Sequence, residues 1–364
     1  MFMLNVNNDI EVSSTLSSKF YSSQDIFNKV VENIFVTSWH LISDDSYFVE
    51  ENYAFPFLLM DEVLPEPLFL VKNKNGIECF SNVCTHRGNI LIKKHGKIKK
   101  TISCNYHGRT FDNMGNFLFM PCTERMKNFP TKRDNLPKIS TSKWNQFIFT
   151  SLNPKFSLND LTKDVDKRVD WMPISDFVYR KDLSNEYIIN ANWALYCDNY
   201  LEGFHIPFIH KDLNNVLNYE EYSVECFKYS SLQIGYGKDN ELCFDLPESS
   251  IDYGKKIAAY YFWLFPNIML NFYPWGLSIN IIKPLSKDKT KVNFYSYVWN
   301  EDFLNKGAGA DVNKVEIEDQ EVVTSVQKGV NSRLYKSGRF SPNMEQGVHH
   351  FHTIIKNFMS NNDK

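Results

Sequence analysis

The sequence lacks any hydrophobic run of the roughly 20 residues needed to cross a bilayer. Its most apolar stretch, residues 257–270, is interrupted by Pro266 and Asn267. The first residues mix Asn, Asp and Ser, and they lack the basic stretch followed by an apolar stretch that marks a secretory signal. We therefore expect a cytoplasmic protein.

Three further features that the sequence lacks reduce the number of possible functions: long basic runs, nucleotide-binding motifs and a disulfide framework. The formal net charge is −3 and basic residues occur only in short clusters such as residues 97–100, which excludes a strong attraction to nucleic acid. No glycine-rich motif for a flavin or a nicotinamide nucleotide is present. The seven cysteines are odd in number and irregularly spaced, so we expect free thiols or metal ligands and no disulfide framework.

The composition is that of an ordinary globular protein, in a chain long enough for two domains. Hydrophobic residues make up 43% and charged residues 23% of the 364 residues, which is typical of a folded protein in water. Aromatic residues reach 15%. A codon bias toward Phe and Tyr explains that number at least as well as an aromatic-lined pocket does.

The pattern along the chain predicts an α+β protein with three segments. A helix over residues 23–36 lies in an N-terminal segment, residues 1–40, that is expected to pack on the C-terminal domain. Residues 41–155 carry short β-rich runs separated by Gly, Pro and Asn, which predict an all-β domain. Residues 156–364 form the second domain. Its expected helices span residues 158–169, 193–204 and 312–330, and its expected strands span residues 186–190, 222–227, 258–265, 277–283 and 291–298.

Two short loops in the β-rich segment each combine one cysteine and one histidine. The first is Cys84-Thr85-His86-Arg87-Gly88 and the second is Cys104-Asn105-Tyr106-His107-Gly108. Each supplies a thiolate and an imidazole, and each ends in a glycine suited to a turn. Two such loops facing each other can hold a [2Fe–2S] cluster, with the cysteines on one iron and the histidines on the other.

Zinc is the alternative metal, because two cysteines and two histidines also make a closed tetrahedral site. The usual zinc spacing pairs Cys with Cys and His with His, whereas both halves are mixed here. The spacing therefore favours the cluster over zinc, and over a chance arrangement of unrelated core residues.

A second group of ligand-type residues follows, on the helix predicted at residues 193–204. At 100° per residue, Asp198, Glu202 and His205 share one helical face. A proline two residues after His205 is expected to end this helix, which allows His210 to turn toward a metal held by His205. Two histidines and one carboxylate leave positions open for oxygen and substrate, as in non-haem Fe(II) oxygenases. A lone histidine beside a proline is more often structural, but this combination favours a metal site.

Periodicity predicts the third ligand of this site in the helix at residues 312–330. Valines recur there at three- and four-residue steps and define a buried stripe: Val312, Val315, Val322, Val323, Val326 and Val330. Asp319 falls in the middle of this stripe, where an unpaired buried charge would be costly. Asp319 is the predicted ligand and Glu318, about 100° away, is the alternative. A helix irregularity that exposes Asp319 is the structural alternative.

The two loops resemble the C-x-H…C-x-x-H loops of Rieske proteins, and nearly the whole chain resembles the α subunit of a Rieske non-haem iron oxygenase. Respiratory and photosynthetic Rieske proteins usually carry an additional cysteine in each loop, which forms a disulfide. Asn89 and Arg109 flank the loops here, so the resemblance is to the ring-hydroxylating branch. Many members of that branch have Trp where this chain has Arg109. This departure concerns the surface near the cluster and not its ligands.

The resemblance implies an N-terminal all-β Rieske domain and a C-terminal helix-grip domain, whose antiparallel sheet surrounds a mononuclear Fe(II). It also implies a homotrimer in which the cluster of one subunit lies near the mononuclear iron of its neighbour. Glu202 matches the acidic residue that links His107 of one subunit to His205 of the next, and Asp198 matches an Asn or Asp one turn earlier. Both carboxylates are expected to serve catalysis. Electrons are expected from NAD(P)H through a separate flavin or ferredoxin-type reductase, with no nucleic-acid or membrane partner.

Within the family the chain is similar to choline monooxygenase-like enzymes. This resemblance implies hydroxylation or demethylation of a small organic substrate with O2, and a quaternary ammonium compound is the expected class. The residues expected to supply cation–π contacts are Phe272, Tyr273, Trp275 and Trp263. An aromatic-ring hydroxylating dioxygenase is the alternative enzyme, and a Rieske electron carrier is the alternative that is not an enzyme. The histidines at positions 349, 350 and 352 are interpreted as structural.

Overall fold

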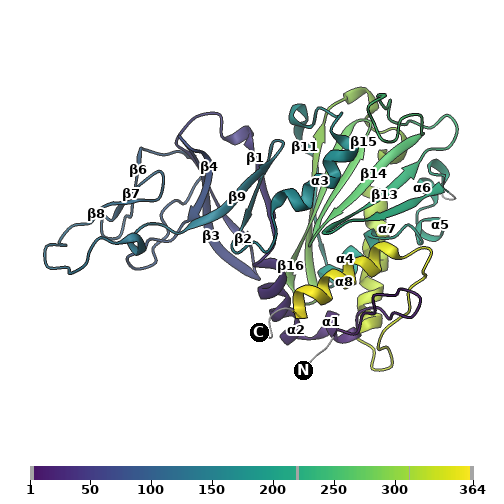
Figure 1. The fold of residues 1–364 in the computed structure, drawn as a ribbon, viewed down its shortest axis with the longest axis horizontal. Coiled ribbons are helices and arrows are strands. Elements are labelled where there is room, and N and C mark those ends of the chain that lie inside the picture. Colours follow the sequence, from purple (N-terminus) through teal and green to yellow (C-terminus); the bar gives the residue numbers. More distant parts are fainter. Residues whose placement is uncertain (1–3, 219–220, 311, 361–364) are drawn as a thin grey trace. The chain divides into compact units, whose positions relative to one another are not determined.

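The computed structural model describes residues 4–218, 221–310 and 312–360. The chain divides into two compact units (Figure 1). One is continuous in sequence and spans Val36–Leu158. The other combines the N-terminal residues up to Phe35 with the chain from Asn159 onward. The predicted α+β class is confirmed.

The unit of residues 36–158 is built from β-strands. A seven-stranded antiparallel sheet runs in the order β1-β10-β9-β4-β3-β2-β5, and a smaller sheet runs in the order β6-β7-β8. The larger sheet consists of β1 (His40–Asp44), β2 (Tyr53–Met60), β3 (Leu64–Asn73), β4 (Gly76–Ser81), β5 (Gly96–Lys97), β9 (Lys138–Trp144) and β10 (Phe147–Ser151). The smaller sheet consists of β6 (Thr101–Ser103), β7 (Thr110–Asp112) and β8 (Phe117–Phe119). Two 3-10 helices complete the unit, η2 (Asp45–Tyr47) and η3 (Lys132–Asp134).

The hairpin of β3 and β4 shows how local sequence directs this unit. Asn73 Oδ1 accepts a hydrogen bond from the Asn75 N–H at 2.9 Å, and Gly76 has a φ of +107°. Glycine adopts such a positive φ at little cost, which suits a tight turn between two apolar strands. The strands place Phe69 and Phe80 in a core cluster that also contains Cys84. The loops with the cysteine–histidine pairs are thereby anchored in the apolar interior.

The other unit contains a seven-stranded antiparallel sheet in the order β11-β17-β16-β15-β14-β13-β12. Strands β12 to β17 are neighbours in sequence order, and β11 lies at the edge beside β17. The strands are β11 (Val178–Ile189), β12 (Ser223–Cys226), β13 (Ser230–Tyr236), β14 (Ile257–Leu264), β15 (Ile268–Tyr273), β16 (Gly276–Ser286) and β17 (Lys289–Val298). The five predicted strands are confirmed, whereas β13 and β15 were not predicted.

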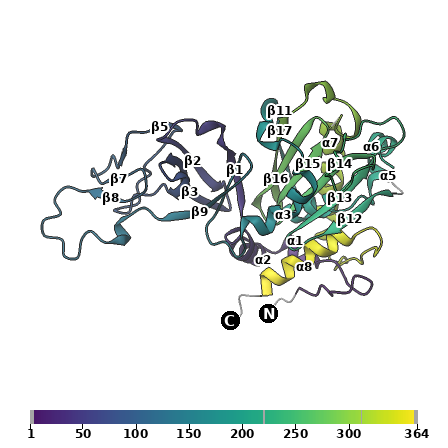
Figure 2. The ribbon, with the colours of Figure 1, turned by 45° about the horizontal axis from the view of Figure 1, so that its top comes forward.

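The helices of this unit come from both ends of the chain. They are α1 (Ser18–Ser22), α2 (Gln24–Val30), the π-helix η1 (Val31–Phe35), α3 (Leu158–Val169), α4 (Trp193–Tyr200), α5 (Ile206–Ile209), α6 (Lys211–Val216), α7 (Val312–Val330) and α8 (Gln346–Ser360), with short 3-10 turns η4 (Ile174–Asp176), η6 (Glu301–Phe303) and η7 (Gly307–Gly309). Helix α8 lies beside the N-terminal helices in both views (Figures 1 and 2). Helix α4 packs against α7 and α8. No helix in the described part of the chain has the length and apolar character needed to cross a membrane.

Candidate active site and metal centres

The two loops with cysteine–histidine pairs share one backbone design. In each loop the cysteine N–H donates to the carbonyl of the residue five positions later, and the glycine N–H donates back to the cysteine carbonyl at 3.0 Å. The two glycines have φ of +74° and +71°, which other residues adopt only with strain. The residues of these turns are Cys84, Gly88 and Asn89 in the first loop and Cys104, Gly108 and Arg109 in the second.

The four predicted cluster ligands converge, with the sulfur atoms inside and the imidazoles outside. Cys84 and Cys104 are 2% and 3% exposed, whereas His86 is exposed and His107 is half-buried. The two imidazole rings lie 4.7 Å apart between centroids, at 73° to each other. Burial raises the pKa of the Cys84 thiol, and the adjacent Cys104 thiol raises it further. The donor set fits a [2Fe–2S] cluster with one sulfur-bound and one imidazole-bound iron.

The segment that carries Glu202 and His205 leaves its helix earlier than predicted. Helix α4 ends at Tyr200, so the prediction that Asp198, Glu202 and His205 share one helical face is wrong. Pro207 does not end a helix either. It lies in the first turn of α5, where its missing N–H costs no helical hydrogen bond.

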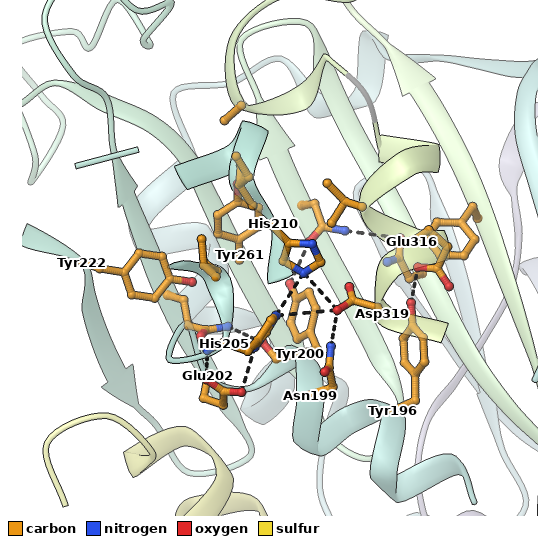
Figure 3. Close-up of a pocket in the computed structure, with 18 of the residues that line it drawn as sticks. Tyr196, Asn199, Tyr200, Glu202, His205, His210, Tyr222, Tyr261, Glu316 and Asp319 are labelled. Atoms are coloured by element: carbon orange, nitrogen blue, oxygen red, sulfur yellow. Dashed lines mark hydrogen bonds and ion pairs between the residues drawn. The ribbon is translucent and has the colours of Figure 1, made fainter. Parts of the chain in front are cut away.

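Three side chains nevertheless meet at one point: His205, His210 and Asp319 (Figure 3). The Nε2 atoms of the two histidines are 3.1 Å apart, and Asp319 Oδ1 lies 3.0 Å from His210 Nε2 and 3.6 Å from His205 Nε2. An ion bound about 2.1 Å from each donor, at angles of about 90–110°, gives donor separations of about 3.0–3.4 Å. The observed triangle therefore has the size of a metal site.

The other ring nitrogen of each histidine is held by a glutamate. Glu202 Oε1 lies 2.7 Å from His205 Nδ1, and Glu318 Oε2 lies 2.8 Å from His210 Nδ1. Each ring is thereby oriented with Nε2 toward the triangle. Glu318, the alternative ligand, lies across the His210 ring from Asp319. Burial by itself lowers the pKa of His210. The hydrogen bonds and negative charges of Asp319 and Glu318 have the larger combined effect, so the pKa of His210 is raised.

Helix α7 presents Asp319 on a face that only partly coincides with the predicted valine stripe. Asp319 Oδ1 accepts a hydrogen bond from Asn199 Nδ2 at 2.6 Å. Val326, predicted to be buried, is 43% exposed, and the side chain of Val312 lies outside what the structure describes. Among the described side chains of α7, the buried ones are Glu316, Val323, Gln327 and Val330. Of the predicted stripe only Val323 and Val330 are therefore buried, and two members of the buried face are polar.

Asp198 connects helix α4 to residues near both ends of the chain, Tyr21 and His352. Its carboxylate accepts a hydrogen bond from the Tyr21 hydroxyl at 2.8 Å and lies 2.8 Å from His352 Nε2. The Leu16 N–H donates to His352 Nδ1 at 3.2 Å, so the ring donates to Asp198 through Nε2. Asp198 thus positions α4. His352 is 1% exposed and contributes to packing and hydrogen bonding, in agreement with its interpretation as a structural residue.

A cavity opens beside the triangle of His205, His210 and Asp319 (Figure 3). Among the described residues that line it there is no Lys or Arg. Its aromatic members are Tyr196, Tyr200, Tyr222, Tyr261, Tyr273 and Phe294, and its uncharged amides are Asn199, Gln233, Asn271 and Asn280. Among the described lining residues, the cavity combines π-faces with acidic groups, and its basic side chains are the histidines of the triangle, His205 and His210.

Of the four aromatic residues predicted to contact a substrate, only Tyr273 lines this cavity. Phe272 precedes it on β15, and neighbouring side chains of a strand point to opposite faces of the sheet. Trp263 packs against Phe351 at 5.0 Å between ring centroids. Trp275 stacks on Tyr273 at 5.3 Å and so supports the lining ring.

Glu316 and Gln233 are among the buried residues of the lining that were not predicted. Glu316 is 4% exposed and accepts hydrogen bonds from the Tyr196 hydroxyl and, at 3.2 Å, from Gln320 Nε2. Burial raises the pKa of its carboxyl to about 8, although the bond from Tyr196 lowers it. The signal for Glu316 was its position one turn before Asp319. No comparable signal marks Gln233, which lies in a strand that was not predicted.

Gln233 is 2% exposed and is fixed through one end of its amide. Its Nε2 donates to the Tyr200 carbonyl at 2.7 Å, while its Oε1 has no hydrogen-bond partner among the described residues. A buried amide oxygen without a partner is unusual, because burial without a hydrogen bond is costly. Gln233 Oε1 and the Tyr261 hydroxyl are thus two buried polar atoms of the described lining for which no hydrogen-bond partner is found.

Both units have counterparts in known families. Residues 168–361 match the ring hydroxylating alpha subunit (catalytic domain), and residues 39–130 match the Rieske [2Fe-2S] domain. The chloroplastic choline monooxygenase of Arabidopsis thaliana is 28% identical in an alignment 365 positions long, which covers 95% of this chain and 83% of the relative. The carnitine monooxygenase oxygenase subunit of Escherichia coli (strain K12) is 28% identical in an alignment 359 positions long, which covers 94% of this chain and 92% of the relative.

Two solved structures share the fold. The quaternary ammonium Rieske monooxygenase CntA, in complex with the inhibitor MMV12, aligns with a TM-score of 0.79 at 22% identity and covers 98% of this chain and 99% of its own. Naphthalene 1,2-dioxygenase with indole bound in the active site aligns with a TM-score of 0.71 at 16% identity and covers 98% of this chain and 95% of its own.

Proposed function

Because this chain belongs to the ring hydroxylating alpha-subunit family and is an oxygenase with a Rieske [2Fe–2S] cluster and a mononuclear iron, we propose that it hydroxylates or demethylates a small quaternary ammonium compound. Zinc in the two loops and an electron carrier without enzymatic activity are both excluded by this family membership. The chloroplastic and bacterial relatives named above support the substrate class.

The proposal assigns each metal to residues of this chain. Cys84, Cys104, His86 and His107 would hold the cluster, which stores an electron delivered from outside. His205, His210 and Asp319 would hold the mononuclear iron, which supplies the oxygen-activating chemistry of the family. The protein's part is to fix these donors: Glu202 and Glu318 orient the two imidazoles, and Asn199 holds the Asp319 carboxylate.

The proposal includes the partners that the resemblance implies. Electrons would come from NAD(P)H through a separate reductase, and the subunits would form a cytoplasmic homotrimer in which Glu202 links His107 of a neighbouring subunit to His205. Residues 41–155 would be the Rieske domain and residues 156–364 the catalytic domain, with residues 1–40 packed on the latter. The metal-site triangle with a carboxylate behind each imidazole is consistent with this assignment.

The observation that carries the substrate class is the lining of the cavity. Six aromatic rings and a buried carboxyl surround a space beside the triangle, and no described lining residue is Lys or Arg. Aromatic faces attract quaternary ammonium groups by about 0.5–2 kcal/mol each. A neutral aromatic hydrocarbon, the substrate type of the alternative dioxygenase, would use the same rings but would gain nothing from the buried carboxyl.

Single-turnover oxidation tests this function without the native reductase. The protein is reduced under nitrogen, mixed with ¹⁸O₂ and one candidate substrate, and the product is identified by mass spectrometry. Choline, glycine betaine or L-carnitine should give a product with one ¹⁸O or its demethylated form, whereas naphthalene and indole should give none. The His210→Ala variant, which lacks one predicted iron ligand, is the matched control and should give no product. Oxidation of naphthalene alone would establish the alternative enzyme.

A further inference from the structure

We propose that the cavity selects a quaternary ammonium alcohol over a quaternary ammonium carboxylate, with Glu316 facing the cationic group and Gln233 accepting a hydrogen bond from the hydroxyl. This inference rests on the proposed function, since it divides the substrate class named there.

Glu316 is the carboxyl of the lining that neither contacts a histidine of the triangle through a hydrogen bond nor belongs to the triangle itself. Glu202 is bound to His205, and Asp319 belongs to the metal-site triangle. The hydrogen-bond partners of Glu316 are the neutral groups of Tyr196 and Gln320. A buried carboxylate with only neutral partners is stabilised by a ligand that brings a positive charge.

A substrate carboxylate would find no Lys or Arg side chain in the described lining of this cavity. These side chains are the strongest partners of a buried carboxylate. The carboxylate would also be repelled by the ionised form of Glu316. The charge pattern therefore favours a ligand that is a cation as a whole, not a zwitterion.

Gln233 specifies what the remainder of the ligand must donate. Its Nε2 is used by the Tyr200 carbonyl, which leaves Oε1 to accept. A quaternary ammonium group has no N–H to donate, and a carboxylate has no hydrogen, whereas a hydroxyl satisfies an acceptor of this kind. The two features together point to an amino alcohol with a fully alkylated nitrogen.

Binding to the oxidised, metal-loaded protein under nitrogen tests this selection, because no turnover occurs there. Choline is compared by calorimetry with L-carnitine, with 3,3-dimethylbutan-1-ol, which is an uncharged isostere, and with ethyltrimethylammonium, which lacks the hydroxyl. Choline should bind at least about 10-fold more tightly than each of the other three. This comparison needs only the unaltered protein.

Three variants separate the two contacts. Glu316→Gln should weaken choline about 10-fold or more and leave the isostere within about twofold. Gln233→Leu should weaken choline and the isostere and leave ethyltrimethylammonium unchanged. Glu321→Gln, which removes an exposed charge from the same helix, is the matched control and should change neither affinity.

Each opposite outcome overturns a defined part of the inference. L-carnitine binding as tightly as choline would overturn the selection against carboxylates. Unchanged choline affinity in Glu316→Gln or in Gln233→Leu would overturn the corresponding contact. If no quaternary ammonium compound bound to the unaltered protein while indole did, the proposed function itself would fail.

The loops of the predicted cluster ligands carry a second, independent inference: Arg109 and Asp134 form a non-covalent clasp between them. The Arg109 Nη2 donates to Asp134 Oδ1 at 2.7 Å and to the Asp134 carbonyl at 3.1 Å. The Thr85 hydroxyl donates to that same carbonyl at 2.8 Å. Arg109 belongs to the second loop and Thr85 to the first, so both loops are tied to one residue.

The Arg109 side chain of this clasp is buried and packs against aromatic rings. Arg109 is 2% exposed, and its guanidinium lies 4.8 Å from the centroid of the Phe117 ring and within 6 Å of two further rings. The residue that departs from the usual family pattern therefore has a structural reason to be charged.

A double-mutant cycle on cluster retention tests the clasp. Arg109→Gln and Asp134→Asn should each release the cluster to a chelator about 10-fold faster, and the double variant should be no faster than the singles. Lys97→Gln, in an exposed ion pair of the same unit, is the matched control and should release it at the unaltered rate. Control-like release in both singles, or a double variant about 100-fold faster, would overturn the clasp.

The reduction potential of the cluster gives a second measurement. A variant that only destabilises the two loops would not shift this potential according to the sign of the charge removed. Removing the positive charge in Arg109→Gln should lower the potential of the cluster, and removing the negative charge in Asp134→Asn should raise it. A tenfold change in the ratio of reduced to oxidised cluster corresponds to 59 mV for one electron. Shifts of the same sign in an EPR-monitored titration would overturn the placement of this charge pair beside the cluster.

Discussion

The Glu316 carboxyl makes the affinity for a cation depend on pH, and the size of the effect can be worked out. Burial raises its pKa to about 8, so roughly one carboxyl in ten is ionised at pH 7 and roughly nine in ten at pH 9. A unit charge about 6 Å away, at an effective dielectric constant of about 20, attracts the ionised form by about 3 kcal/mol. The ionised carboxyl therefore binds the cation roughly 100-fold more tightly than the neutral one.

Combining both numbers gives the expected titration. In protein whose mononuclear site has been emptied by a chelator, choline affinity should rise about ninefold from pH 7 to pH 9, and binding at pH 7 should release about 0.8 proton. The chelator is needed because a bound dication would add its own charge to the cavity. Glu316→Gln should bind choline about 10-fold more weakly than the unaltered protein at pH 7 and about 90-fold more weakly at pH 9.

The assay is calorimetry in two buffers of different ionisation enthalpy, which reports the protons released as well as the affinity. The sign is fixed by the direction of the pKa shift: the raised pKa keeps the carboxyl neutral below about pH 8, and a cation favours its ionised form. A flat choline affinity across this range in the unaltered protein, or an equal slope in Glu316→Gln, would refute the reasoning. The uncharged isostere should show no slope in either protein.

Three further variants separate the two metal centres. Cys104→Ala should lose the visible chromophore and fall from about three irons per chain to about one, and a retained chromophore would contradict the cluster assignment. Asp319→Ala should lose the mononuclear iron while the cluster remains reducible. Glu318→Ala should keep the iron, with about 10- to 100-fold weaker affinity. The reverse result would make Glu318 the ligand. Glu202→Gln should keep both metals but oxidise the reduced cluster slowly in stopped-flow single turnover, and unaltered rates would remove Glu202 from the electron path.

Sequence reasoning succeeded where the ligand chemistry lies in short contiguous motifs. The mixed spacing of Cys84 with His86 and of Cys104 with His107 required two facing loops, because each half supplies only one sulfur and one imidazole. Helical phase pointed to Asp319, and the structure brings its carboxylate together with His205 and His210, although Asp319 is only half-buried.

Sequence reasoning failed where function depends on contacts between distant strands and helices. Glu316 and Gln233 are ordinary polar residues in isolation, and only tertiary packing buries them. Strand β13, which carries Gln233, begins with two serines and shows no simple alternation of apolar and polar residues. The helix that ends at Tyr200 was predicted to run four residues further, because Leu201 and Phe204 continue its apolar pattern. The structure ends the helix before Gly203, a position against which the Tyr222 ring packs closely.

The contacts of Asp198 with Tyr21 and His352 have a consequence for biosynthesis. The unit of residues 36–158 is continuous, so all its strands are available once residue 158 has left the ribosome. The other unit combines the residues up to Phe35 with the chain from Asn159 onward, which includes α7 and α8. The residues of both cluster loops are therefore synthesised before His205, His210 and Asp319, which form the triangle. Tyr21 is likewise synthesised long before its two hydrogen-bond partners, Asp198 and His352.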